Sequence, residues 1–157
     1  MFESVDDIYN YIGQAAFNAL PDEWHSAQID VLMYNAVAPR RSLSVIQQYC
    51  LTDNGTPSDF DTDEVDGEVI DSNVSEAFYA LYDLMKTETH KIPWNKTRFF
   101  LTSEGDFEID FKLDEDYEWY KALSVDSQEY DELDIDIINQ IKTWEGLPEG
   151  APRSWRN

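Results

Sequence analysis

Near the N-terminus, apolar residues recur at intervals of three and four, which is the spacing of one face of a helix. Ser4 precedes this run, and Asp7 stands where a capping box places its acidic residue. The run stops before Pro21, which cannot continue a helix. The pattern therefore predicts an amphipathic helix whose apolar face consists of Val5, Ile8, Ile12, Ala15, Ala16 and Leu20.

The spacing then changes to the alternation of apolar and polar residues that is typical of strands. Within residues 25–34 the apolar residues Ala27, Ile29, Val31 and Met33 occupy every second position, and residues 43–51 are rich in Val, Ile and Tyr. Residues 36–40, with Pro39, are expected to connect these two strands as a hairpin. A second and clearer hairpin is predicted for residues 97–101 and 106–113, around the turn Ser103-Glu104-Gly105.

Two further segments have helical spacing. Asn73 is the predicted N-cap of the first, because Glu76 follows three residues later. The second runs from Leu133 to Trp144 and is followed by Gly146 and Pro148 as a stop. Between the first hairpin and these helices lies the acidic stretch 52–73, which we expect to be a long exposed loop. The pattern does not decide whether Val69 and Ile70 form a short edge strand within this loop.

The order helix, two strands, helix, two strands, helix predicts an α+β fold, and the short hairpin links favour an antiparallel sheet. We expect the N-terminal, central and C-terminal helices to pack on that sheet. A chain of 157 residues is long enough for one hydrophobic core. The predicted single domain comprises residues 1–148, and residues 149–157 are expected to form a mobile tail.

The net charge of the chain says more about its binding partners than any sequence motif does. The chain has 33 Asp and Glu against 11 Lys and Arg, a formal net charge of −22, yet 42% of its residues are apolar and 14% are aromatic. That apolar content argues against disorder. A folded surface of one sign repels nucleic acids and anionic lipids, and it attracts basic proteins. We therefore expect a basic protein partner, with no direct contact to nucleic acid or membrane.

The same composition bears on location. The N-terminus carries Glu3, Asp6 and Asp7 where a secretory signal would have basic residues, and no stretch approaches the roughly 20 apolar residues of a membrane span. With Cys50 as the single cysteine, an internal disulfide is impossible and a buried thiol is expected. These features predict a cytoplasmic protein.

Catalytic chemistry finds little support in the residues. The chain has only His25 and His90, and it lacks a glycine-rich phosphate loop. Asp59, Asp61 and Asp63 have the spacing that opens a calcium loop, but Glu64 and Ile70 occupy the glycine and twelfth-position glutamate places. We interpret them as a solvated acidic loop and expect no enzyme activity, metal or cofactor.

The acids are segregated, since no Lys or Arg occurs between Arg41 and Lys86. Within this gap a first candidate surface consists of the steering charges Asp59, Asp61, Asp63, Glu64, Asp66 and Glu68. Acids next to aromatic residues are typical of interfaces with basic proteins. They define a second candidate surface, Asp114, Asp116, Trp119 and Tyr120. The alternatives are that the first group only solubilises a loop and that the two aromatic residues cover the core. Trp155 in the tail is a docking residue or has no role.

Several motifs in one order resemble the YezG-like immunity or antitoxin family. They are the N-terminal helix, Leu20-Pro21, Trp24 opening a strand and Trp94 preceding another. The last is the hairpin 99–111 with Gly105-Asp106-Phe107 and Ile109-Asp110-Phe111, so that the resemblance covers about Ile8 to Leu113. It implies a cytoplasmic protein that binds and neutralises a cognate bacterial toxin, commonly a nuclease domain, without catalytic residues of its own.

Two other functions stay open from the residues alone. One is an acidic mimic of nucleic acid that inhibits a host DNA-binding protein. The other is a carboxylate-dependent or metal-dependent hydrolase, because any two of the acids could approach each other in the fold. Competition by DNA for the partner would distinguish the first alternative, and metal-dependent turnover the second.

Overall fold

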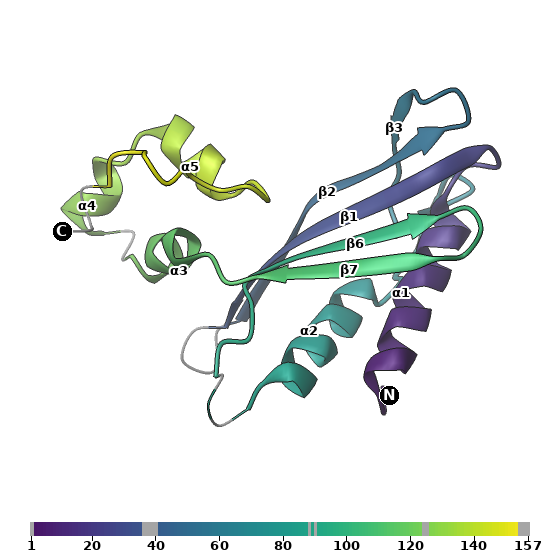
Figure 1. Ribbon diagram of the computed structural model, residues 1–157, viewed down its shortest axis with the longest axis horizontal. Coiled ribbons are helices and arrows are strands. Elements are labelled where there is room, and N and C mark those ends of the chain that lie inside the picture. The colour runs from purple at the N-terminus through teal and green to yellow at the C-terminus, as the bar shows by residue number, and fades with distance from the viewer. Residues whose placement is uncertain (1, 36–40, 88, 90, 124–125, 154–157) are drawn as a thin grey trace.

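A five-stranded antiparallel sheet organises the protein in the computed structural model, which describes residues 2–35, 41–87, 89, 91–123 and 126–153. Two helices of the described part cover one face of the sheet, and three short helices stand at one end of it (Figure 1). The expected connection 36–40, His90 and Trp155 lie outside the described residues.

The α+β class and the antiparallel pairing are confirmed. The sheet has the strand order β3-β2-β1-β6-β7, and β4 and β5 pair separately. No helix in the described ranges is long and apolar enough to cross a membrane. The elements are α1 Val5–Ala19, β1 Trp24–Asn35, β2 Arg41–Thr52, β3 Pro57–Asp59, β4 Glu64–Val65, β5 Glu68–Val69, α2 Val74–Met85, β6 Lys96–Thr102, β7 Phe107–Lys112, α3 Glu115–Ala122, α4 Gln128–Asp131 and α5 Ile135–Ile141.

Helix α1 begins and ends as its sequence predicts. The Ser4 side chain accepts from the Asp7 N–H at 3.2 Å, and the Asp7 carboxylate accepts from the Glu3 N–H. At the other end the Leu20 N–H donates to the carbonyl of Ala16, before Pro21. The apolar face of α1 packs with α2 against one sheet face and forms the main core, which also buries Cys50 on β2. Burial raises the pKa of the Cys50 thiol.

Asn73 is the N-cap residue of α2, as predicted, but it does not cap the helix with its side chain. Asn73 adopts a left-handed conformation with φ of 58°, and its side chain makes no capping hydrogen bond. The Ser72 hydroxyl accepts from the Val74 N–H instead and donates to the Asp63 carboxylate. Asn tolerates a left-handed backbone better than Ser does. Asn73 therefore provides the turn into the helix, and the neighbouring Ser72 provides the side-chain acceptor.

The C-terminal third differs most from the prediction. Between the second predicted hairpin and the last predicted helix, where the pattern predicts no element, the structure has α3 and α4, and the last helix is shorter than residues 133–144. These helices enclose a second, small core around Leu32, Tyr117, Tyr120 and Ile141.

The expected tail also has contacts as far as it is described. The Arg153 guanidinium pairs with the Asp116 carboxylate at 2.9 Å. It also donates to the carbonyls of Leu147, Glu149 and Ala151. Residues 149–153 are therefore tied to α3, and residues 154–157 lie outside the described part.

Candidate partner-binding site

The acidic stretch is a folded element and not only a long loop. Asp66 and Gly67 have φ of 52° and 80°, and they join β4 to β5 in a tight hairpin. Two bonds to Asp63 tie this hairpin down: its carboxylate accepts from the Ser72 hydroxyl at 2.6 Å, and its carbonyl accepts from the Ile70 N–H at 2.8 Å. Phe60 is buried in the main core just before the hairpin. The acids are therefore held in fixed positions.

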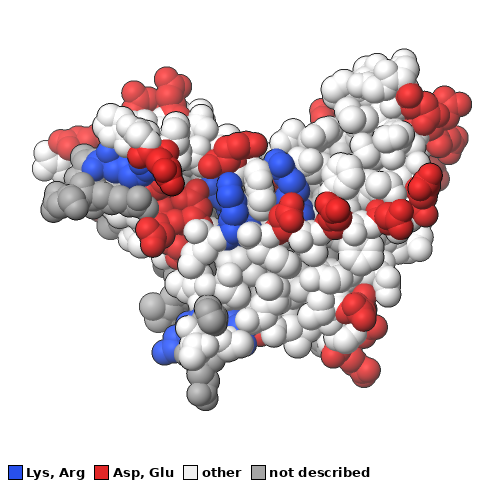
Figure 2. Space-filling model, in the orientation of Figure 1, with Lys and Arg blue, Asp and Glu red and all other residues white. Residues whose placement is uncertain are grey.

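All six predicted steering acids are solvent-exposed, and none forms an ion pair among the residues that the structure describes. Asp61 and Asp63 use carboxylate oxygens to hold the stretch together. In Figure 2 acidic side chains gather at the β3 end of the molecule. No three His, Cys, Asp or Glu side chains converge as a metal site within the described ranges.

The second predicted surface has an internal role. The Asp114 carboxylate caps α3 by accepting from the Asp116 N–H at 2.9 Å, and Asp116 is only 4% exposed. Tyr120 is buried, and its ring stacks on Tyr130; Trp119 packs against the second core. These four side chains hold the C-terminal helices in place.

Lys96 joins those helices to the sheet. It is fully buried, and its ammonium donates to the Asp114 carboxylate at 2.5 Å and to the carbonyls of Ile141 and Thr143 at 2.8 and 2.6 Å. Burial lowers the pKa of Lys96, while Asp114 acts against that shift. Gly146 packs onto the pair with φ of 71°, and a Cβ there would lie 2.5 Å from the Asp114 Oδ2 atom. Only glycine fits this approach.

A second anchor centres on Trp144. The Lys112 ammonium and the Arg98 guanidinium lie 4.8 and 4.9 Å from its ring centroid, and Lys112 also donates to its carbonyl at 2.7 Å. Arg98 forms a two-pronged ion pair with Asp30 at 2.8 and 3.0 Å, which raises the pKa of Arg98. The cations of β6 and β7 thus have internal partners.

The C-terminal helices cover only one end of the second sheet face. A groove of about 550 Å³ separates them from the rest of that face, and its opposite walls include Tyr49 on β2 and Trp144. From the groove outwards the register places five residues side by side across the five strands. This cross-strand row is Asp59, Tyr49, Gln28, Phe100 and Glu108.

The sequence prediction included Asp59 but missed the rest of this row. In β7 the apolar residues Phe107, Ile109 and Phe111 lie on the face that the helices cover. Glu108 and Asp110 lie between them in the sequence, where the alternation indicates ordinary solvent-facing residues. Phe100 directly follows Phe99, and one of two adjacent strand residues must face away from the core. That adjacency was the available signal for an aromatic residue on the open face.

One titratable group on α3, the Glu118 carboxyl, supports a pH-dependent prediction. Glu118 accepts from the Asn95 side chain at 3.2 Å, and burial raises its pKa. A carboxyl whose pKa is higher in the folded than in the unfolded state stabilises folding at low pH, and this contribution is lost as the pH rises through the folded value. Glu118→Gln should therefore stabilise the protein at pH 7.5, by less than about 1 kcal/mol because the site is partly screened by solvent.

Urea denaturation at pH 7.5 and at about pH 5 measures this effect. The gain from Glu118→Gln should shrink at the lower pH. Glu149→Gln, at an exposed position, controls for the general relief of negative charge. Equal gains for both variants at both pH values would refute the prediction.

No protein-family model and no curated protein matches the chain. The resemblance to YezG-like immunity proteins therefore rests on the order of the sequence motifs.

Proposed function

We propose that this chain is an immunity protein that binds a cognate cationic bacterial toxin domain, with a nuclease as the expected toxin, and neutralises it by blocking it. The observation that carries the proposal is the set of exposed carboxylates from Asp59 to Glu68, on β3 and on the ordered β4–β5 hairpin that follows it, in a chain of net charge −22. None of them forms an ion pair with the residues that the structure describes. The order of motifs that resembles the YezG-like family supports the same function.

Electrostatic steering explains how such a protein would act. Nucleases present basic clefts to the phosphate backbone, and an acidic protein competes for the same cleft. Long-range attraction raises the association rate, and this gain falls with salt. Because hydrogen bonds hold the backbone of the hairpin that carries the carboxylates, less ordering of the chain is required on binding. Inhibition needs no turnover and no cofactor on this protein.

Co-expression tests the proposal. The chain is expressed with the C-terminal domain of a large secreted protein encoded beside it, and cell survival and co-purification are scored. We expect survival and a stoichiometric complex whose affinity decreases with salt. A folded, toxic neighbour that is neither bound nor neutralised would contradict the proposal. Recovery of a non-toxic DNA-binding protein that DNA displaces would instead favour the nucleic-acid mimic.

A further inference from the structure

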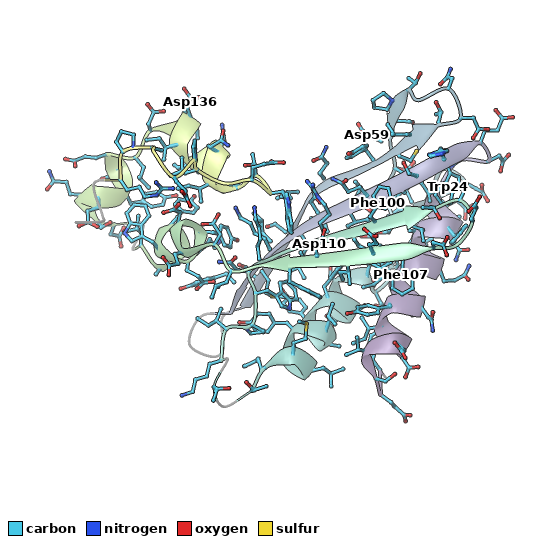
Figure 3. The ribbon with its side chains drawn as sticks, viewed as in Figure 1. Trp24, Asp59, Phe100, Phe107, Asp110 and Asp136 are labelled. Carbon is cyan, nitrogen blue, oxygen red and sulfur yellow. The ribbon has the colours of Figure 1, made fainter. Side chains whose placement is uncertain are left out.

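The uncovered part of the second sheet face has two aromatic residues at its centre. Tyr49 and Phe100 flank Gln28 in the cross-strand row, and both rings are half-buried. Neither belongs to the main core or to the second core among the described residues. In Figure 3 Phe100 lies on the open face of the β6–β7 hairpin and Phe107 on the helix-covered face. Large aromatic side chains without a core role are the usual anchors of protein interfaces.

Carboxylates surround these rings. Asp59 ends the row on β3, Glu108 ends it on β7, and Asp110 follows two residues later on the same face. All three are exposed. The cations near them have internal contacts: Arg98 is paired with Asp30, Lys112 lies over the Trp144 ring, and Lys142 on the groove wall lies over the Tyr120 ring. The open face therefore combines an aromatic centre with a negative rim, which complements a basic surface.

The face is also hollowed. The groove of about 550 Å³ runs between the sheet and residues 139–145, and Figure 2 shows a notch in the outline between these two parts. Gln47 and Asn139 line opposite walls, and both amides are exposed without a hydrogen-bond partner in the part of the chain that is described. Free amides on two walls can bind the backbone of a segment that enters between them.

We propose that this open face is the docking surface for the toxin domain, and that it receives a protruding segment of the toxin that carries Lys or Arg. This inference rests on the proposed function and identifies the surface through which the protein would contact the toxin. Charge complementarity selects the occupant: a second copy of this chain would bring the same carboxylates, and nucleic acid would be repelled. Tyr49 and Phe100 would bury the stems of the basic side chains, and Asp59, Glu108 and Asp110 would pair with their charged ends.

A matched pair of variants on one hairpin tests the aromatic centre. Phe100→Thr should raise the dissociation constant for the inactivated toxin domain about tenfold, as loss of an interface anchor does. Phe107→Thr, on the other face, should leave it unchanged although it removes contacts to Tyr9 and Phe99. Isothermal titration calorimetry measures binding, and circular dichroism checks that each variant is folded.

Charge reversal tests the rim independently of the aromatic residues. The double variant Glu108→Lys/Asp110→Lys should weaken binding at least as much, whereas Glu129→Lys/Asp131→Lys on α4 changes the charge equally and should have a smaller effect. If both hairpin variants on the open face bind like the wild type while the complex still forms, the docking surface is wrong and the proposed function stands.

A defined peptide tests the face without any toxin. The probe is (Gly-Arg)6, followed by amide chemical shifts of the 15N-labelled protein. We expect shifts along β2, β6 and β7 that Glu108→Lys/Asp110→Lys abolishes. Shifts confined to the β4–β5 hairpin or to α4 would overturn the inference. Peptide binding at the open face combined with no neutralised toxin would instead refute the proposed function.

Discussion

Lys96→Met is expected to lower the free energy of unfolding by about 3–5 kcal/mol, the cost of breaking a buried ion pair by removing one partner. The methionine has nearly the same length, so packing changes little. The loss comes from the Asp114 carboxylate, which is 15% exposed and would have no cation. The carbonyls of Ile141 and Thr143 would also lose their donor. Urea denaturation, followed by tryptophan fluorescence, measures the change.

The damage should concentrate at the C-terminal helices, because Lys96 joins them to the sheet. Hydrogen exchange should therefore accelerate in α3 and α5 more than in α1. Lys91→Met at an exposed position is the control and should stay within about 0.5 kcal/mol of the wild type. Adding Asp114→Asn to Lys96→Met should recover part of the loss, since the uncompensated charge is then gone. A loss below about 1 kcal/mol for Lys96→Met would show that the buried pair does not hold this region.

Local signals in the sequence were enough for the elements that lie on the main core. The spacing of Ile8, Ile12 and Ala16 located α1, and the alternation in β1 and β7 gave both hairpins their faces. Each of these patterns repeats over several turns or residue pairs, and each reports one buried side of one element. The antiparallel sheet and the α+β class followed from their order.

The C-terminal helices could not be predicted in the same way. Tyr117 and Ile141 are buried only because they meet Leu32 from a distant strand. A lysine such as Lys96 is normally assigned to the surface, and only the approach of Asp114 and two carbonyls makes its burial tolerable. Asp114 and Asp116 looked like surface charges because their partners, Lys96 and Arg153, are far away in the sequence.

The sequence predicted that the candidate site is acidic, but it did not predict which residues the fold brings together there. The gap between Arg41 and Lys86 indicated an acidic surface, and the structure confirms that those acids are exposed. The row that joins Asp59 to Phe100 depends on the register of five strands, and register is not visible in a single sequence. A surface of this kind becomes evident only when the pairing is known.

Reversing charge on the β4–β5 hairpin should slow association with the toxin domain about tenfold or more at low salt, because steering by fixed charges raises association rates by that order. The variant is Glu64→Lys/Asp66→Asn/Glu68→Lys. Asparagine is chosen at position 66 because this residue has φ of 52°, a conformation that Asn adopts readily. Asp59 is left intact, since it also belongs to the proposed docking face. Stopped-flow fluorescence over a series of salt concentrations measures the rate.

The dissociation rate separates steering from contact. If the hairpin only steers, its reversal lowers the association rate and flattens its salt dependence while dissociation changes little. The control Glu129→Lys/Asp131→Lys/Asp136→Asn has the same change in charge on α4 and α5, and it should slow association less. Equal slowing by both variants would mean that net charge alone attracts the toxin. If the association rate and its salt dependence are unchanged in the hairpin variant, these carboxylates contribute only to solubility.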